Sequence, residues 1–328
     1  MRARAPASAA NLGPGFDALA LALDLYVEVE VVPADHLSVR SEGEGADLAD
    51  DAGHLAARVA MDVVGHDRLA ITVRSEIPVA RGLGSSAALA AAAAAAAGAA
   101  DPLAVAARVD GHPENAAASV LGGLLVATGV RGAVRTAPMP LDPSLVFVAV
   151  VPDRPLSTAR ARQVLPATVS RADASFNLGR MGLMLAGLAD HRRLEREAAE
   201  DRLHQDYRSP LFPEAPKILS GLLEGGALAA CWSGAGPTLL GITTADAVSG
   251  LKTAAERVLA STGLPGQVLV LHADLRGLVT GEAARISLSG RSDQADEGAR
   301  DLSALPPPPP ATGTGGGSGD VFDFDTEG

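Results

Sequence analysis

The sequence predicts an α+β fold, and three observations lead to this class. Strand-like and helix-like segments are interspersed along the chain. Their order lacks the regular strand–helix–strand alternation of a doubly wound parallel sheet. The length of 328 residues also allows two domains with a substantial core. We therefore expect an N-terminal domain over residues 1–150 and a C-terminal domain over residues 151–288.

Seven segments have the pattern of β-strands. Residues 23–33 and 69–78 alternate apolar and polar side chains, which indicates strands with one solvated face. Residues 145–152 (LVFVAVVP) form a continuous apolar run, as expected of a buried central strand. The other predicted strands are residues 121–128, 227–233, 237–242 and 268–272, the last being the final strand. Before Pro6 we expect only a short strand, followed by a loop.

Three segments are predicted to be helical, and one is predicted to be disordered. Residues 82–100 form an alanine-rich helix that opens with glycines and serines, and residues 102–109 form a second helix. Residues 180–201 have the pattern of a long amphipathic helix. From Ser289 onward proline and glycine dominate, so we expect residues 289–328 to be a disordered tail.

Composition excludes several classes of protein. The net charge of −12 argues against a nucleic-acid-binding protein, which needs a basic face, although a few arginines can still bind a small anion. Cys231 is the only cysteine, which excludes a disulfide framework and suits a reducing compartment. We find no secretory signal and no apolar window of about 18 residues. We expect a cytoplasmic protein without membrane contacts.

The strongest local signal is a glycine–serine loop at residues 82–88 (GLGSSAA), between a predicted strand and a predicted helix. Glycines let the backbone approach a ligand closely, and N–H groups at a helix N-terminus bind phosphate. The serine hydroxyls add donors or a ligand for a phosphate-bound Mg²⁺. The alternative interpretation is a tight turn in which Ser85 or Ser86 caps the helix.

Two better-known phosphate loops do not fit this segment. A P-loop requires a lysine, and none is near. A dinucleotide-binding fingerprint is nominally present, because Gly82, Gly84 and Ala87 match G-x-G-x-x-A and Asp101 follows. That acid should end a second strand, but here it follows an alanine-rich helix and precedes a proline. The dinucleotide interpretation therefore fails.

Three segments together resemble the three motifs of the GHMP small-molecule kinases. They are residues 6–17 (PASAANLGPGFD), 78–88 (PVARGLGSSAA) and 233–238 (SGAGPT), in that order. Further segments resemble the homoserine kinase branch: residues 111–115 (GHPEN), 121–123 (LGG), 156–159 (LSTA) and 201–208 (DRLHQDYR). The resemblance spans about residues 5–284.

The resemblance implies a fold and a reaction. The fold would have an N-terminal ribosomal-protein-S5-like domain that binds ATP and a C-terminal ferredoxin-like α/β sandwich domain. The reaction would be ATP-dependent, Mg²⁺-dependent phosphorylation of the L-homoserine side-chain hydroxyl, giving O-phospho-L-homoserine and ADP for threonine biosynthesis. It also implies a homodimer.

The resemblance assigns site residues in four groups. Nucleotide binding is assigned to Pro78, Arg81, Gly82, Leu83, Gly84, Ser85, Ser86 and Ala87, with His54 near the adenine. Substrate binding is assigned to Asn11, Asp17, His112, Asn115, Arg162 and Arg208. A glycine loop near the active site comprises Ser233, Gly234, Gly236 and Thr238, and the metal ligands are Ser86 and Asp110. Catalysis is assigned to Asn115 and Arg162.

The side-chain chemistry agrees with these roles. A small zwitterion needs a cation for its carboxylate, which Arg162 and Arg208 offer, and an acid for its ammonium, which Asp17 offers. Arg160 competes with Arg162, which we favour for its spacing from Thr158. Other branches of the superfamily place an aspartate base where Asn115 stands. Because an amide cannot accept the proton, we predict a mechanism without a side-chain base, in which Asn115 orients the hydroxyl.

Simpler interpretations exist for several residues. Asn11 and Asp17 flank glycines and could cap a turn. His112 precedes a proline in an apparent loop. The pattern also departs from the family in three places. Asp110 stands where the family usually has glutamate, and Glu114 stands where it usually has aspartate. His54 stands where family members usually have an asparagine near the adenine. The alternative functions are a GHMP kinase for another alcohol and a non-catalytic sensor with the same fold.

Overall fold

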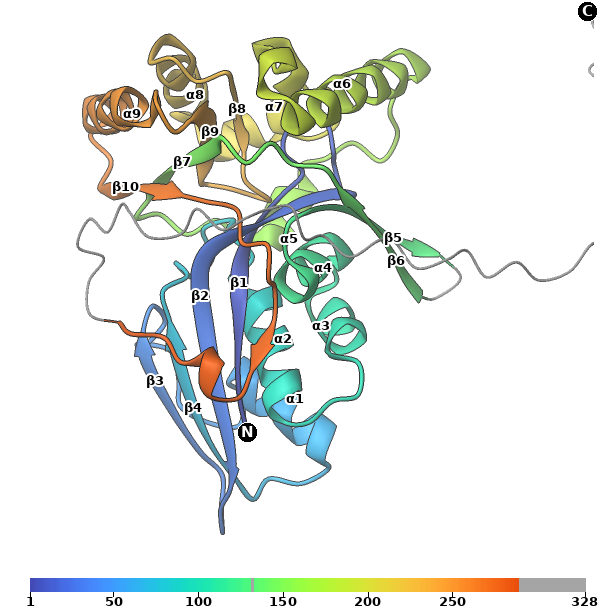
Figure 1. Cartoon of the computed structure of the whole chain (residues 1–328), viewed down its shortest axis with the longest axis vertical. Coiled ribbons are helices and arrows are strands. Elements are labelled where there is room, and N and C mark those ends of the chain that lie inside the picture. Colours follow the sequence, from blue (N-terminus) through green and yellow to red (C-terminus); the bar gives the residue numbers. More distant parts are fainter. Residues whose placement is uncertain (131–132, 289–328) are drawn as a thin grey trace, which may run out of the picture. The chain divides into compact units, whose positions relative to one another are not determined.

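The structure is a computed structural model that describes residues 1–130 and 133–288. Residues 1–288 form one compact unit, and the predicted tail at residues 289–328 lies outside the described residues. The described part contains a seven-stranded sheet and a four-stranded sheet, together with helices (Figure 1). The predicted α+β class is confirmed, and the proposed boundary near residue 150 falls within a strand.

The seven-stranded sheet comes mainly from the N-terminal half. Its strands are β1 (Arg2–Ala10), β2 (Leu19–Pro33), β3 (Ser38–Gly43), β4 (Leu69–Ser75), β5 (Leu124–Val130), β6 (Ala133–Met139) and β11 (Val279–Thr280). The strand order is β11-β1-β2-β4-β3, and β5 pairs with β2 and β6. All pairs are antiparallel except β3 with β4.

Four helices cover one side of this sheet (Figure 1). They are α1 (Leu55–Val64), α2 (Ser85–Ala96), α3 (Pro102–Asp110) and α4 (Pro113–Leu121). The helix α2 lies between the sheet and its neighbours, and its residues 90–96 are all buried alanines. Alanine has the highest helix propensity, and its small side chain lets surrounding elements approach from every direction. The alanine-rich run therefore forms a central helix whose N-terminus is fixed by packing.

The four-stranded sheet is antiparallel and comes from the C-terminal half. Its strands run in the order β10 (Gly266–Leu271), β7 (Leu145–Pro152), β9 (Leu239–Thr244) and β8 (Ala229–Trp232). Helices α8 (Ala215–Glu224) and α9 (Val248–Thr262) pack on one face, and the other face joins the core of the first sheet. Every residue of β7 is buried, which confirms the central strand predicted from its apolar run.

Three sequence-based expectations about local structure are wrong. The strand β1 continues to Ala10, through an irregularity between Pro6 and Ala7, because pairing with β2 outweighs the low β-propensity of alanine and serine. The predicted helix at 180–201 is instead α6 (Arg171–Ala189), capped at its start by Ser170 and followed by 3₁₀ turns. The strand β10 is not the last, since β11 returns to pair with β1.

The Glu28 side chain links three strands of the first sheet by ion pairs and holds the segment around Ile286 by a hydrogen bond. The buried carboxylate of Glu28 contacts Arg2 and Arg74 at 3.1 and 2.9 Å, and it accepts the backbone N–H of Ile286.

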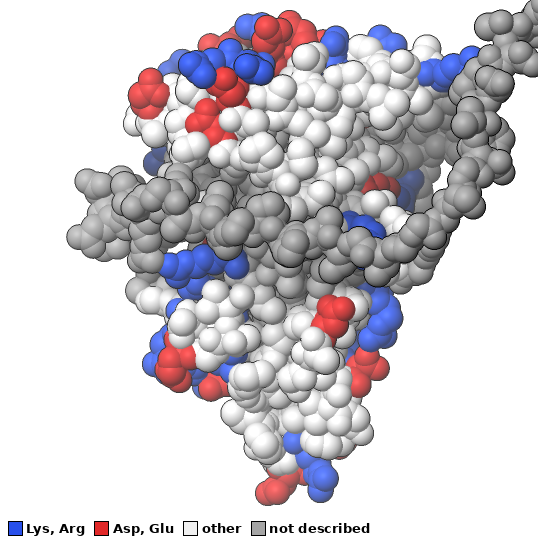
Figure 2. All heavy atoms as spheres, turned by 45° about the vertical axis from the view of Figure 1, so that its right-hand side comes forward, with Lys and Arg blue, Asp and Glu red and all other residues white. Residues whose placement is uncertain are grey.

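Elsewhere on the surface, acidic and basic side chains are interspersed on the described part of the face in Figure 2. Among the described helices, none combines the length and apolar character needed to cross a membrane.

Candidate active site

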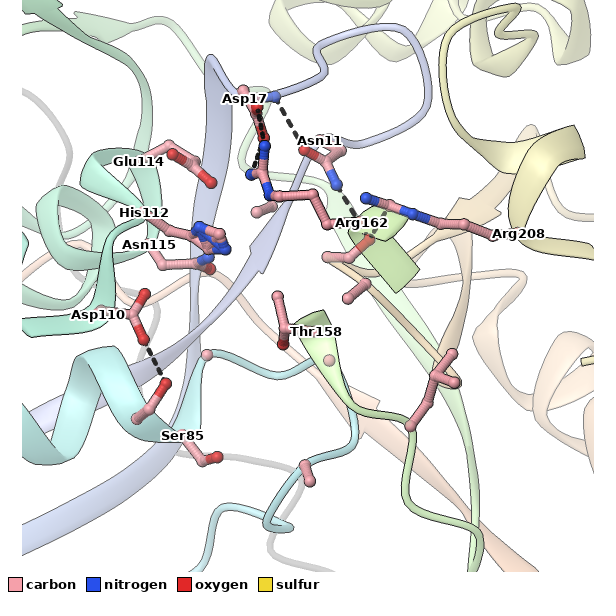
Figure 3. Close-up of a pocket in the computed structure, with 18 residues that line it drawn as sticks. Asn11, Asp17, Ser85, Asp110, His112, Glu114, Asn115, Thr158, Arg162 and Arg208 are labelled. Atoms are coloured by element: carbon pink, nitrogen blue, oxygen red, sulfur yellow. Dashed lines mark hydrogen bonds and ion pairs between the residues drawn. The ribbon is translucent and has the colours of Figure 1, made fainter. Parts of the chain in front are cut away.

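Several loops and helix ends meet around one cavity (Figure 3). The lining residues come from the loop between β1 and β2, the start of α2, the junction of α3 and α4, the short helices α5 (Thr158–Gln163) and α7 (Gln205–Arg208), and the loop after β8. In Figure 3, Ser85 and Asp110 lie at one end and Asp17, Arg162 and Arg208 at the other, with Thr158 between them. The cavity therefore has two chemically different ends.

The glycine–serine loop forms the first end. Gly82 and Gly84 have φ values of 78° and 65°, a region that favours glycine. A side chain at Gly84 would begin 2.0 Å from the Ser8 hydroxyl oxygen. Gly84 itself is the N-cap of α2, so the alternative in which Ser85 or Ser86 caps the helix is wrong. Among the described residues no side chain caps these N–H groups, which can therefore bind an anion.

Ser86 and Asp110 meet beside this helix start. The Ser86 hydroxyl donates a hydrogen bond to the Asp110 carboxylate, at the end of α3. Burial raises the pKa of Asp110 above its usual value, because the anion is largely removed from water. A cation between the phosphate end and these two oxygens would relieve that cost. The structure thus brings the two predicted metal ligands together.

The start of α4 supplies the middle of the cavity. His112 lies in the short connection between α3 and α4, as expected, and it is the N-cap residue of α4. Its Nδ1 is buried and has no hydrogen-bond partner among the described residues. The Asn115 Oδ1 accepts a hydrogen bond of 2.9 Å from the buried Ser8 hydroxyl. This contact leaves the Nδ2 group as the donor that Asn115 can offer to a ligand.

Asp17 and Arg162 bind each other at the second end. Both guanidinium NH groups of Arg162 donate to the Asp17 carboxylate at 2.9 Å, and this contact raises the pKa of Arg162. Asn11 supports the same loop, because its Oδ1 accepts the Asp17 N–H and its Nδ2 donates to the Gly234 carbonyl. Asn11 thus joins the loop after β1 to the glycine loop after β8.

Arg208 is the buried cation of the site, with a side chain from helix α7 (Gln205–Arg208) and 3% exposure. Its NH1 group donates to the Gly234 carbonyl and to His204 Nδ1, both at 2.9 Å. Burial lowers its pKa to about 10. Within the described residues no carboxylate lies within 4.0 Å of its guanidinium, in contrast to Arg162. Arg208 is therefore a positive charge available to an anionic group in the cavity.

A second cavity adjoins the glycine–serine loop. It is mostly apolar, and Leu48, Leu55 and Leu89 line it together with Ser85, Ser86 and His54. The Nδ1 of His54 accepts the Ala56 N–H and so caps α1, while burial lowers the pKa of His54. This lining suits the faces of a flat ring beside the phosphate end.

Other predicted residues shape the loops without lining these cavities. Leu83 and Ala87 are fully buried, and Pro78 is buried. Arg81 donates to the carbonyls of Val79 and Pro152. The Ser233 hydroxyl donates to the Gly82 carbonyl, and the Thr238 N–H donates to the Arg81 carbonyl. Gly236 packs against the Trp232 ring so closely that a Cβ would begin 2.5 Å from it. These contacts clamp the glycine loop onto the glycine–serine loop.

Sequence reasoning left several site residues unassigned. Thr158 lies four residues before Arg162, which places both on one face of α5, and both line the cavity. Arg160 is not among the lining residues, so the spacing argument selected the arginine that faces the cavity. Glu114 also lines it, and burial raises its pKa. Glu114 and Thr158 both belong to segments that resemble family motifs, but only the fold shows that their side chains line the cavity.

Comparisons with known proteins agree with this architecture. The family model for the GHMP kinases N-terminal domain matches residues 52–123, and that for the GHMP kinases C-terminal domain matches residues 184–260. The crystal structure of homoserine kinase from Cytophaga hutchinsonii has a TM-score of 0.75 and 23% identity, and the match covers 85% of this chain and 96% of that one. The predicted GHMP kinase fold is confirmed.

Curated sequences establish the branch. The homoserine kinase of Streptomyces coelicolor is 40% identical over 283 residues, a match that covers 79% of this chain and 91% of that protein. A homoserine kinase of Thermus thermophilus is 41% identical over 256 residues, covering 73% of this chain and 86% of that protein. With its three motifs meeting at one cavity, this chain belongs to the homoserine kinase family of the GHMP kinases.

Proposed function

We propose that this chain is a homoserine kinase, which transfers the terminal phosphoryl group of ATP to the side-chain hydroxyl of L-homoserine. The products are ADP and O-phospho-L-homoserine, a precursor in threonine biosynthesis. One observation carries the proposal: a single cavity has a helix N-terminus at one end and a buried arginine at the other, and among the described residues no side chain caps the first and no carboxylate pairs with the second. The first end suits a phosphate and the second suits an amino acid.

The nucleotide lies across the two adjoining cavities. The N–H groups at the start of α2 bind its phosphates, helped by the positive end of the helix dipole. Its base enters the apolar cavity that His54 and the three leucines line. ATP is the phosphoryl donor expected of a GHMP kinase.

Mg²⁺ is held by Ser86 and Asp110. A hydroxyl and a carboxylate oxygen facing each other beside a phosphate site are the hard oxygen donors that this ion prefers. When bound, the ion neutralises negative charge on the phosphate oxygens. Burial raises the pKa of Asp110, and a bound cation would stabilise its ionised carboxylate.

The amino-acid end of the substrate binds at the opposite side. Its carboxylate contacts Arg208, whose buried charge lacks a carboxylate partner among the described residues, and then Arg162. Its ammonium contacts Asp17 and Glu114, which line the main cavity and, with Arg162, also line a further cavity beside it. Binding therefore opens the Asp17–Arg162 ion pair and inserts the zwitterion between its two charges. By holding the substrate against the start of α2, Arg162 contributes to catalysis through positioning.

No side-chain base takes part in the transfer. Ser8 engages Asn115 Oδ1, so Asn115 presents its Nδ2 group to the substrate hydroxyl oxygen as a donor. A bond forms between that oxygen and the terminal phosphorus while the bond to the bridging oxygen of ADP breaks. The hydroxyl proton leaves late and passes to an oxygen of the transferred phosphoryl group. Because the transition state is loose, positioning and N–H donors supply most of the stabilisation.

A substrate panel tests the proposal. ADP release is measured with purified protein, Mg·ATP and, separately, L-homoserine, D-homoserine, L-serine, L-threonine, mevalonate and galactose. We expect turnover with L-homoserine alone. Turnover only with another alcohol would keep the phosphate site but refute the roles of Arg162 and Arg208. Nucleotide binding without any turnover would favour a sensor.

Three further properties are part of the proposal; the first rests on the family resemblance and the other two on composition and charge. They are a homodimeric assembly, a cytoplasmic location and the absence of nucleic-acid and membrane partners. The division into domains at residues 1–150 and 151–288 likewise stays a prediction. Light scattering of the purified protein tests the assembly, since a mass twice that of the 33.0 kDa chain is expected.

A further inference from the structure

We propose that His204 is a positioning residue for substrate recognition. It holds Arg208 in place by bridging the Gly13 carbonyl and the Arg208 guanidinium as a neutral imidazole protonated at Nε2. The inference rests on the proposed function, because Arg208 is taken to bind the substrate carboxylate. His204 itself is fully buried and is not among the residues that line the cavity, so it acts through Arg208.

The two ring nitrogens of His204 have different partners, and these determine its tautomer. Nε2 lies 2.7 Å from the Gly13 carbonyl oxygen, and Nδ1 lies 2.9 Å from NH1 of Arg208. A carbonyl only accepts and a guanidinium only donates. Nε2 must therefore carry the hydrogen, and Nδ1 must present its lone pair. A second proton on the ring would break the contact with Arg208.

The ring also packs against the loop that carries Asp17. It stacks on Phe16, with 5.1 Å between ring centroids and 22° between ring planes. The guanidinium carbons of Arg208 and Arg162 lie 5.5 and 5.8 Å from the Phe16 centroid. His204 thus contacts both the loop after β1, which carries Asp17, and the buried cation Arg208. It lies between the two parts of the proposed substrate-binding site.

The backbone around His204 is fixed independently of its side chain. Asp201 Oδ2 accepts the N–H groups of His204 and Gln205, at 2.8 and 2.7 Å. Gln205 Oε1 in turn accepts the Trp232 N–H, next to the glycine loop. Because Asp201 and Gln205 hold this turn, replacing the imidazole should change the position of Arg208 more than the position of the chain.

The surroundings of His204 agree with a neutral ring. Burial lowers its pKa to about 4, and the positive charge of Arg208 acts in the same direction, whereas Asp201 and Asp17 oppose it. At neutral pH the ring therefore keeps the lone pair that Arg208 requires. An arginine side chain has many rotamers, so a fixed acceptor near its end reduces the entropy lost when the substrate carboxylate binds.

Three substitutions separate the two contacts of the ring. His204→Asn keeps an acceptor near the Nδ1 position, His204→Gln keeps a donor near the Nε2 position, and His204→Ala keeps neither. Loss of a hydrogen bond to a charged group predicts a KM for L-homoserine raised roughly 10- to 150-fold in His204→Ala and His204→Gln. His204→Asn should stay within about 5-fold of the parent, and the KM for ATP should change less than about 2-fold in all three. His66→Ala, at an exposed histidine beyond α1, is the matched control.

The outcomes distinguish this inference from the proposed function. If the parent protein does not phosphorylate L-homoserine, the proposed function fails. If the parent is active but all variants keep its KM, or if His204→Asn is as impaired as His204→Ala, the positioning role is refuted. An equal rise in both KM values would indicate a general structural role and would also refute it.

A measurement on the unsubstituted protein covers the case in which the variants do not fold. Nitrogen NMR of histidine-labelled protein reports which ring nitrogen carries the hydrogen. Besides His54, whose Nδ1 also accepts an N–H and whose pKa is lowered by burial, we expect a second histidine with an unprotonated Nδ1 and a protonated Nε2 that persists at about pH 5, where exposed histidines are charged. A ring in that environment with a protonated Nδ1 would refute the inference.

Discussion

In the described structure Asp17 and Arg162 bind each other, and the proposed function requires this pair to open when the substrate enters. A double-mutant cycle with Asp17→Asn, Arg162→Gln and the double variant tests that requirement. The two hydrogen bonds are 2.9 Å long, but the side chains are 40% and 46% exposed. Solvent screening therefore limits the worth of the pair in the unliganded protein to about 0.5–1 kcal/mol.

The substrate contacts are worth more than the ion pair they replace. A hydrogen bond to a charged group contributes about 1.5–3 kcal/mol. Less the cost of opening the pair, each single variant should lose about 0.5–2.5 kcal/mol, or roughly 2- to 70-fold in kcat/KM for L-homoserine. Each single substitution also removes the cost of opening the pair, which offsets part of its loss. The double variant recovers that cost only once. Its loss should exceed the sum of the single losses by about 0.5–1 kcal/mol, or roughly 2- to 5-fold.

The assay is steady-state ADP release at saturating Mg·ATP over a range of L-homoserine. Urea unfolding of the same four proteins gives the free energy of the ion pair independently, and this value should match the excess in the kinetic cycle. If the pair stays closed in the complex, either substitution disrupts the same unit. The double variant would then have a kcat/KM no lower than that of the more impaired single variant, and the account of substrate insertion would be refuted.

Three other predictions follow from neighbouring contacts. Ser8→Ala leaves Asn115 Oδ1 without its hydrogen-bond donor. An unsatisfied buried acceptor costs about 1–3 kcal/mol, so kcat should fall roughly 10-fold or more, while the KM for ATP changes little. An unchanged kcat would contradict the role of Asn115. Gly84→Ala should weaken nucleotide binding measured by calorimetry, because its Cβ meets Ser8; Gly98→Ala, which has positive φ and open space, should lose stability through backbone strain alone. The pKa of His204 is about 4 in the folded protein and about 6.5 when unfolded, so the unfolded chain binds the proton first as the pH falls. The contribution of neutral His204 to the free energy of unfolding is complete above about pH 6.5 and is lost as the pH falls toward about 4, by up to about 1.4 kcal/mol per pH unit. Thermal unfolding at several pH values should show a smaller slope in His204→Asn.

Local patterns predicted those parts of the fold whose signal lies within one segment. The apolar run of β7 and the alanine run of α2 were assigned correctly because burial on all sides leaves no alternation to interpret. The strand β1 was missed beyond Pro6 because its alanines and serines carry little strand signal. Only pairing with β2, which lies beyond the turn, makes this segment extended.

The candidate site was predicted where motif letters carry the chemistry and missed where distant segments meet. Ser86 and Asp110 were assigned as a pair and do lie together. His204 was part of a motif but received no role, because its partner Gly13 is 191 positions away in the sequence. Likewise, nothing local in the sequence indicates that Ser8 orients Asn115, since that contact exists only after the first sheet and α4 have packed.

The central claim is that phosphate is transferred to the hydroxyl of a bound amino acid. Phosphorus NMR of a reaction containing Mg·ATP and L-homoserine tests it most directly. The account predicts one new phosphomonoester signal, coupled to the protons of the terminal CH₂ group and formed in equal amount with ADP. Free phosphate without that signal, or an acyl phosphate on the carboxylate, would contradict the account, because Arg208 is proposed to hold the carboxylate at the end of the cavity away from the phosphate site.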